Sequence, residues 1–302
     1  MIDRLAAAIR KFAPDAVLLH YEPMARHTSF KVGGPADLMF FPQNENQVAF
    51  ALNIAKKHGV GVQVIGKGTN LLVRDGGIRG LVIKLDSPMA GGTIYRGILR
   101  AQAGASLKDI CLSARNNELA GLEFACGIPG SIGGAVAMNA GAYDGEIKDV
   151  LVGAQVLLDG QIEWWPLERM DCGYRTTLPL RLGGVILEAA FKLKGDDPAA
   201  ITARMAENDQ RRRDKQPLDD PSAGSTFKRP PGKYAGPLID ECALRGARLG
   251  GAQVSEKHAG FIINAGGATA RDILDLIALV QEKVYAQHGV TLEPEVRILG
   301  ED

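Results

Sequence analysis

The amino-acid sequence predicts an α+β fold made of three successive segments. Residues 1–80 show a strand–helix–strand pattern, and residues 81–195 show short strands with a strong hairpin signal. Asp196-Asp197-Pro198 interrupts the pattern, and a mixed helical segment, residues 196–302, follows it. A chain of 302 residues is long enough for two or three hydrophobic cores. We therefore expect three parts, with boundaries near residues 80 and 195.

The first segment opens with an amphipathic helix, because apolar residues repeat at helical spacing at Ile2, Leu5, Ile9 and Phe12. A second helix has one face formed by Val48, Leu52 and Ala55, and Gly59 ends it. Apolar runs predict strands at 38–41, 61–65, 71–73 and 81–85. Residues 15–21 support no prediction.

The second segment is expected to be antiparallel. A strand is predicted at 99–103, and Ser106 with Asp109 resembles a capping box that opens a helix through about Leu119. Asp159-Gly160 stands between two apolar runs, at 152–158 and 161–167, and is typical of a two-residue hairpin turn. A further strand is predicted at 185–193, and residues 91–97 support no prediction.

The third segment begins with a helix at about 199–213. The loop at 216–237 contains five prolines and is too long to be a simple connector. Thr269 and Asp272 form a second capping box, followed by a helix that Gly289 ends. Residues 296–299 close the chain as a strand.

Composition excludes several classes of function. The 35 acidic and 35 basic side chains give zero net charge, which argues against nucleic acid or an anionic membrane as the main partner. No window has the roughly 18 apolar residues that a membrane span needs, and no signal peptide is recognisable. The four cysteines lack metal-ligand or CxxC spacing, so we expect reduced thiols, a cytoplasmic protein and no metal.

Two glycine-rich loops, each next to expected strands, carry the first functional signal. One is Gly66-Lys67-Gly68-Thr69-Asn70, and the other covers residues 127–143 and includes Ser131. A diphosphate needs backbone N–H groups at close range, and glycines leave that approach open. The spacing differs from that of a Rossmann turn or a P-loop. Tight packing explains either loop alone, but two such loops favour a bound dinucleotide.

Six motifs follow one another along the chain, at 27–37, 66–73, 127–143, 172–175, 224–230 and 292–297. The most specific are Cys-Gly-Tyr-Arg (172–175), Gly-Ser-Thr-Phe-Lys-Arg-Pro (224–230) and Pro-Glu-Val-Arg (294–297). This ordered set resembles the UDP-N-acetylenolpyruvoylglucosamine reductases. The glycine loops resemble the FAD-binding domain of the vanillyl-alcohol-oxidase superfamily. The resemblance implies a two-part FAD-binding α+β region, with subdomains at 1–80 and 81–195, followed by a smaller α/β substrate-binding domain at 196–302.

The resemblance also implies the chemistry, which is reduction of UDP-N-acetylglucosamine enolpyruvate by NADPH through non-covalent FAD. Hydride at the terminal carbon leaves an enolate that must be stabilised and protonated. In the family's pattern Arg175 and Glu295 are catalytic, and Ser225 donates the proton. A serine hydroxyl is a weak acid, but an enolate is a strong base, so fixed geometry makes the transfer feasible.

Outside this motif set, the three residues would be taken as a surface arginine, a charged strand residue and a turn serine. Our hypothesis is that a protonated Glu295 would hold the carboxylate of the intermediate. Retained activity and an unchanged pH–rate profile in Glu295→Gln would contradict it.

The resemblance assigns further contacts to both ligands. Cofactor contacts are expected from Gly66, Lys67, Gly68, Thr69, Asn70, Leu71, Gly127, Pro129, Gly130, Ser131, Gly133, Gly134, Asn139, Gly141, Arg211 and Arg297. Substrate contacts are expected from Tyr143, Tyr174, Lys215, Lys228 and Arg229, with Lys257 and His258 as weaker candidates.

One departure from the family concerns a loop that carries a substrate-covering tyrosine in one subgroup. Only about ten residues separate Arg175 from the strand near Val185, so the chain resembles the shorter subgroup without that loop. Two alternatives remain open, namely another FAD-linked oxidase of the same superfamily and a non-catalytic nucleotide-sugar binding protein. We expect a monomer or weak homodimer.

Overall fold

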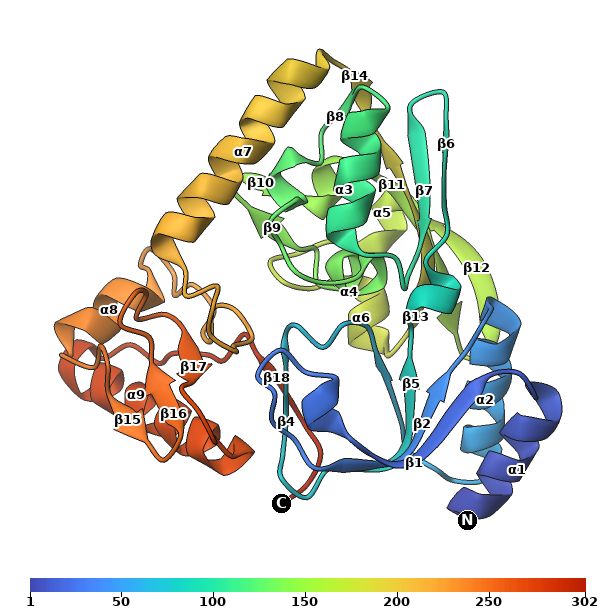
Figure 1. Ribbon diagram of the computed structural model, residues 1–302, viewed down its shortest axis with the longest axis horizontal. Helices are drawn as coiled ribbons and strands as arrows, with labels where there is room; N and C mark the ends of the chain where they lie inside the picture. The colour runs from blue at the N-terminus through green and yellow to red at the C-terminus, as the bar shows by residue number, and fades with distance from the viewer. The chain divides into compact units, whose positions relative to one another are not determined.

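The computed structural model describes residues 1–302, which form two compact units (Figure 1). Unit 1 consists of Met1–Leu19, Leu38–Lys67 and Gly80–Arg212. Unit 2 consists of His20–Asp37, Gly68–Arg79 and Arg213–Asp302. The first 80 residues therefore contribute to both units. The three-part division expected from the sequence stays a prediction.

The strand–helix–strand pattern predicted for the start of the chain is confirmed. The amphipathic helix α1 (Ile2–Phe12) buries Leu5 and Ile9 and packs beside α2 (Glu45–Lys57), as Figure 1 shows. The first sheet has the strand order β1-β2-β5-β3. Its strands are β1 (Val17–Pro23), β2 (Pro35–Phe41), β5 (Ile78–Lys84) and β3 (Val62–Ile65). β3 and β5 are parallel. β3 ends at Ile65, directly before the glycine loop at Gly66.

The second sheet of unit 1 is antiparallel, as predicted, with the strand order β12-β11-β13-β7-β6. Its strands are β12 (Gln161–Pro166), β11 (Leu151–Leu158), β13 (Val185–Lys192), β7 (Ile98–Gln102) and β6 (Gly92–Tyr95). The predicted hairpin joins β11 to β12. Asp159 and Gly160 have φ values of 49° and 79°, as a type I′ turn requires.

Helices of unit 1 cover this sheet. The Ser106 side chain accepts the Asp109 N–H at the start of α3 (Leu107–Asn116), as predicted. The helix ends before Leu119 because Leu119–Ala120 forms β8, which pairs with β14 (Lys194–Gly195). The remaining elements are α4 (Ile132–Ala137), α5 (Leu167–Met170), α6 (Leu178–Leu182), β9 (Gly141–Ala142), β10 (Gly145–Glu146), η2 (Ser87–Met89), η3 (Glu123–Ala125) and η4 (Ile147–Asp149). α7 (Pro198–Lys215) follows β14.

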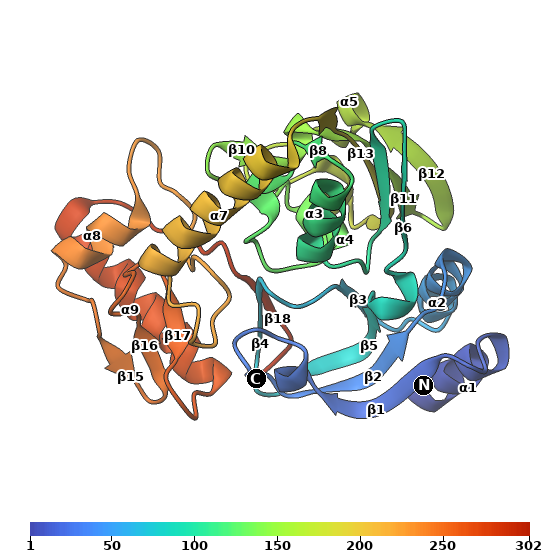
Figure 2. The ribbon, with the colours of Figure 1, turned by 45° about the horizontal axis from the view of Figure 1, so that its top comes forward.

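Unit 2 is built around α9 (Ala270–His288), which packs against a three-stranded antiparallel sheet (Figure 2). The strands are β15 (Arg248–Leu249), β16 (Ala252–Val254) and β17 (Ile262–Asn264), and α8 (Ala235–Glu241) packs against α9. β4 (Leu71–Val73) pairs in parallel with β18 (Arg297–Leu299), and η1 (Met24–Arg26) precedes the 27–37 motif. The predicted capping box of α9 is confirmed, and Gly289 ends the helix at φ 64°.

Candidate active site

The second glycine loop and the start of the first lie against each other in unit 1. A Cβ atom on Gly66 would lie 2.2 Å from Ser131 Oγ, so the approach depends on glycine. Ser131 is buried, at 2 % exposure. The sequence predicted both segments as diphosphate-binding loops, and the start of the first approaches the second through Gly66 and Ser131.

The Ser131 loop is fixed by backbone hydrogen bonds. Ile132 and Gly133 donate N–H groups to the carbonyls of Ala105 and Ala103, each at 2.9 Å. Leu107 N–H donates to the Gly130 carbonyl at 3.1 Å. A Cβ on Gly133 would lie 2.8 Å from the Ala103 Cβ, so this glycine is needed for close packing.

A buried lysine supports the first loop. Lys84, at the end of β5, donates through Nζ to the Gly66 carbonyl at 3.2 Å and lies 3.5 Å from Asp86. Burial lowers the pKa of Lys84, the Asp86 carboxylate opposes that effect, and the Lys67 charge reinforces it. No sequence pattern distinguishes Lys84, since it stands in an ordinary strand.

Arg212 packs against the start of the second loop. A Cβ on Gly127 would lie 3.2 Å from Arg212 Cδ, and burial lowers the pKa of the Arg212 guanidinium. Burial raises the pKa of Tyr143, and the charges of Arg212 and Arg211 act against that shift. Arg211, the predicted cofactor contact, is exposed and pairs with Glu207. The structure therefore adds Arg212 to the candidates, and the triple-arginine run explains why the sequence did not single it out.

The turn that carries Arg175 is attached to the second glycine loop. Arg175 has φ 57°, and its Nη2 donates to the Gly141 carbonyl at 3.2 Å. Its guanidinium lies 5.1 Å from the ring centroid of the exposed Tyr174. The connection from this turn to β13 holds only α6, which agrees with the predicted absence of an inserted loop.

In unit 2, the end of the first glycine loop is joined to the segment of Glu295. Asn70 Nδ2 donates to the Glu295 carbonyl at 3.1 Å, and Arg297 N–H donates to the Asn70 carbonyl at 3.0 Å. A Cβ on Gly68, at φ 67°, would lie 1.9 Å from the His27 carbonyl oxygen. The 27–37 motif thus encloses Gly68, and only glycine fits there.

The Ser225 loop runs beside the same segment. Ser225 pairs with Phe261 and Phe227 pairs with Pro294 as isolated β-bridges. Glu295 N–H donates to the Thr226 carbonyl at 2.8 Å. Ser225 is exposed, while the neighbouring Thr226 is 1 % exposed and accepts the Ile262 N–H through Oγ1 at 3.0 Å. The backbones of the Ser225 loop and of the Glu295 segment therefore lie side by side in unit 2.

The predicted substrate residues of unit 2 follow Ser225 or lie at the end of α7. Lys228 Nζ forms an ion pair with Glu293 at 3.0 Å, and Arg229 lies 4.4 Å from the ring centroid of Tyr234. Lys215 is exposed, and Lys257 donates to the Arg213 carbonyl. The pKa of His258 is lowered chiefly by burial.

The predicted site residues divide between the units. Unit 1 holds Gly66, Lys67, Gly127, Pro129, Gly130, Ser131, Gly133, Gly134, Asn139, Gly141, Tyr143, Tyr174, Arg175 and Arg211. Unit 2 holds Gly68, Thr69, Asn70, Leu71, Lys215, Ser225, Lys228, Arg229, Glu295 and Arg297.

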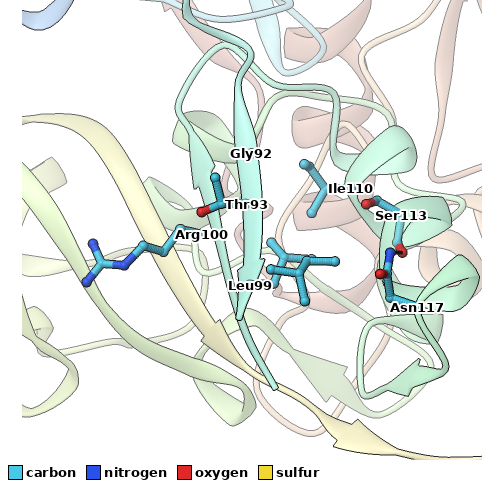
Figure 3. Close-up of a pocket in the computed structure, with 8 residues that line it drawn as sticks. Gly92, Thr93, Leu99, Arg100, Ile110, Ser113 and Asn117 are labelled. Atoms are coloured by element: carbon cyan, nitrogen blue, oxygen red, sulfur yellow. Dashed lines mark hydrogen bonds between the residues drawn. The ribbon is translucent and has the colours of Figure 1, made fainter. Parts of the chain in front are cut away.

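An open cavity of about 340 Å³ lies between α3 and the β6–β7 hairpin of unit 1 (Figure 3). It is lined by Gly92, Thr93, Ile94, Leu99, Arg100, Ile110, Ser113 and Asn117, none of which is a predicted site residue. Arg100 extends away from α3 in Figure 3 and pairs with Glu188 at 2.8 Å. No cluster of metal-ligating side chains is present, and none of the helices combines the length and apolarity needed to span a bilayer.

Two family models match the chain. Residues 36–164 match the FAD binding domain, and residues 216–299 match the C-terminal domain of UDP-N-acetylenolpyruvoylglucosamine reductase. The FAD-binding model covers the second glycine loop, and the C-terminal-domain model covers both Ser225 and Glu295.

Relatives named UDP-N-acetylenolpyruvoylglucosamine reductase extend the match to nearly the whole chain. The Clostridium botulinum protein is 51 % identical over 286 residues, covering 93 % of this chain and 92 % of the relative. The Clostridium perfringens protein is 48 % identical over 281 residues, with the same coverage. The crystal structure of the Thermus caldophilus reductase superposes with a TM-score of 0.80 at 36 % identity, covering 94 % of this chain and 98 % of that one. The chain belongs to the UDP-N-acetylenolpyruvoylglucosamine reductase family.

Proposed function

We propose that this protein reduces UDP-N-acetylglucosamine enolpyruvate to UDP-N-acetylmuramate, a peptidoglycan precursor, with NADPH as reductant and FAD as cofactor. The observation that carries the proposal is the backbone link between the Ser225 loop and Glu295, in which Glu295 N–H donates to the Thr226 carbonyl. It joins the backbones of the two segments that carry Ser225 and Glu295, within a chain about half identical to reductases of this name.

The residues present fit a dinucleotide. Gly66 lies so close to Ser131 that any side chain would fill the space, and Gly134 is exposed next to the Ser131 hydroxyl. A surface of glycines and one short hydroxyl lets backbone N–H groups approach a diphosphate. We assign FAD contacts to both glycine loops, with Arg297, the predicted Arg211 and the adjacent Arg212. None of these residues is a histidine or cysteine, so the attachment is non-covalent.

Bound FAD supplies hydride transfer from NADPH to the terminal carbon of the enolpyruvyl group. The negative charge that develops next to the carboxylate needs a cation and hydrogen-bond donors. Arg175 offers a guanidinium that can bind a carboxylate with two parallel hydrogen bonds. Glu295, in its protonated form, would donate a further hydrogen bond to the same carboxylate.

Ser225 completes the reduction by giving its hydroxyl proton to the carbon next to the carboxylate, which converts the enolate into the lactyl ether. No strong acid is required, because the enolate is itself strongly basic. The protein contributes the position of the donor, because the β-bridges Ser225–Phe261 and Phe227–Pro294 hold the backbone of the loop.

The remaining assignments concern substrate binding and location. We assign the UDP moiety to Lys215, Lys228 and Arg229, with Tyr143 and Tyr174, and the substrate-binding domain to residues 196–302. Residues 1–80 and 81–195 would form the two FAD-binding subdomains. All four cysteines are free thiols, which suits a cytoplasmic enzyme. We further propose that it acts as a monomer or weak homodimer.

The test is turnover with product identification. We expect a yellow protein that oxidises NADPH only when UDP-N-acetylglucosamine enolpyruvate is present. In deuterated water, the product should carry solvent deuterium on the carbon next to the carboxylate. A colourless protein, or one that consumes NADPH as fast with oxygen alone, would contradict the proposal and favour an oxidase.

A further inference from the structure

A set of side-chain hydrogen bonds in unit 1 joins the Arg175 turn to the second glycine loop. Asn139 lies in that loop and is 0 % exposed. Its Nδ2 donates to the Gly173 carbonyl at 3.1 Å and to Glu146 Oε2 at 3.0 Å. Its Oδ1 accepts the Lys148 N–H at 3.0 Å. Both amide hydrogens and the carbonyl oxygen are therefore used within the protein, so this side chain is not available for the cofactor contact predicted from the sequence.

A second buried side chain attaches the other end of the turn. Thr177 is 0 % exposed, and its Oγ1 donates to the Ala137 carbonyl at 2.9 Å. Asn139 and Thr177 therefore join residues 137 and 139 to residues 177 and 173, in antiparallel order. Arg175 lies midway between the two attachments.

The turn between these attachments has an unusual backbone. Gly173 N–H donates to the Thr176 carbonyl at 2.9 Å, and Thr176 N–H donates back at 3.4 Å. Arg175 takes φ 57° between them, a conformation that non-glycine residues rarely adopt unless their surroundings hold it. The guanidinium also donates to the Gly141 carbonyl. Hydrogen bonds therefore attach both the backbone turn and the Arg175 side chain to the glycine loop.

A charged pair lies beside the turn. Glu146 Oε2 accepts from Asn139 and lies 2.7 Å from Lys148 Nζ. The hydrogen bond from Lys148 holds the pKa of Glu146 below its usual range, and the Asn139 amide and the Arg175 charge act in the same direction. Glu146 therefore remains an anion that anchors the Asn139 amide.

We propose that Asn139 and Thr177 are positioning residues, which hold the Arg175 guanidinium at the orientation that the enolate carboxylate requires. This inference rests on the proposed function, because it assigns a purpose to the geometry of Arg175. Removing either attachment frees the turn to leave its φ > 0 conformation. Displacement of a catalytic group by about 1 Å can cost about 100-fold in rate.

The experiment is a double-mutant cycle between Thr177→Val and Arg175→Lys, measured as kcat at saturating substrate. Thr177→Val keeps the shape of the side chain and removes only the hydroxyl. We expect it to lower kcat about 10- to 100-fold in the wild-type background and less than about 2-fold in Arg175→Lys, since the guanidinium is already absent. The rate of flavin reduction by NADPH should stay unchanged, and Thr177→Ser should restore turnover.

Asn139→Ala provides an independent second variant with the same expectation. Two controls remove hydrogen bonds of the same kind at exposed positions elsewhere in unit 1. Thr202→Val loses the bond from Oγ1 to the Pro198 carbonyl, and Asn117→Ala loses the bond from Nδ2 to the Ser113 carbonyl. Both should turn over at the wild-type rate.

Three results would overturn the inference. Wild-type turnover in both Thr177→Val and Asn139→Ala would show that Arg175 needs neither attachment. An equal loss in the Arg175→Lys background, or a parallel loss of flavin reduction, would show a general structural effect. If Arg175→Lys itself turns over normally, the proposed role of Arg175 fails, and the inference fails with it.

Discussion

At the scale of single residues, the proposed reaction depends on how Ser225 is placed. Ser225 forms a β-bridge with Phe261. The next residue is the buried Thr226, whose hydroxyl accepts the Ile262 N–H. Neighbouring backbone therefore fixes the direction of the Ser225 Cα–Cβ bond, while the side chain itself is exposed. A hydroxyl held in this way can deliver a proton to one face of a planar enolate.

We expect Ser225→Ala to separate the two halves of the reaction. Flavin reduction by NADPH should proceed at the wild-type rate, because no proton from Ser225 enters that step. Overall turnover should fall roughly 100- to 10,000-fold, the usual contribution of a positioned general acid. Stopped-flow absorbance and steady-state kinetics measure the two rates.

The control is Ser222→Ala, three residues away in the same loop, which should leave both rates unchanged. Turnover of Ser225→Ala near the wild-type rate would mean that another group donates the proton.

At the scale of loops and helices, the glycine loops show how local conformation supports binding. Gly66 and Ser131 come from segments about 65 residues apart and approach each other because one has no side chain and the other has a short one. Lys84 then donates to the Gly66 carbonyl from the end of β5. The start of the first loop is thus held by a side chain from the neighbouring strand β5.

We expect Gly66→Ala to lower FAD content, because the new methyl group would lie 2.2 Å from Ser131 Oγ and one of the two loops must move. The ratio of visible to protein absorbance after purification measures the loss. Gly195→Ala is the matched control, since a Cβ there meets nothing within 4 Å.

The double variant Gly66→Ala with Ser131→Gly removes the clash and should recover part of the flavin. Full flavin content in Gly66→Ala alone would show that the loops tolerate separation.

The start of α9 gives a pH-dependent expectation. Hydrogen bonds from the Thr269 and Gly251 N–H groups hold the pKa of Asp272 below its ordinary value of 3.8. Since the unfolded chain then binds the proton more tightly, Asp272 stabilises the fold above pH 3.8. That contribution is lost as pH falls through the lowered pKa. Urea unfolding should show Asp272→Asn less stable than wild type at pH 7, with the difference shrinking below pH 3.8.

The partner residue of the same capping box gives a second measurement. Thr269→Ala should lower the free energy of unfolding by about 1 kcal/mol, and Thr269→Ser should not, because it keeps the capping oxygen. A difference between wild type and Asp272→Asn that stays constant with pH would show that Asp272 does not act through its charge.

At the scale of the whole molecule, the sequence predicted elements better than their pairing. Local signals located the N-cap of α3, the capping box of α9, the Asp159-Gly160 hairpin and the long helix α7, because each depends on neighbouring residues. The pairing of β4 with β18 joins residues more than 200 positions apart, and no local pattern encodes it.

Elements that lacked a local signal were missed. β1 contains Tyr21 at φ 52°, and β6 is a four-residue edge strand with three exposed residues, so neither shows apolar alternation. α4 was missed because its sequence lies within the glycine-rich stretch, where glycine disfavours a helix.

For the candidate site too, local motifs were recognised in the sequence, and contacts between distant residues were not. Motifs identified Ser225, Glu295 and Arg175 because the family's chemistry needs those residue types. Residues that act through contacts far apart in sequence, such as Lys84 on Gly66 and Thr177 on Ala137, needed the structure. Asn139 was recognised in its motif, but its three internal hydrogen bonds change the role expected of it.

The most direct test of the central claim is an anaerobic half-reaction. The purified protein is reduced with NADPH in the absence of oxygen, and UDP-N-acetylglucosamine enolpyruvate is then added while the flavin absorbance is followed. We expect the flavin to be reoxidised at once with formation of UDP-N-acetylmuramate, while UDP-N-acetylglucosamine, which lacks the enolpyruvyl group, leaves it reduced. A flavin that stays reduced with the enolpyruvyl substrate and is reoxidised only when oxygen is admitted would contradict the account.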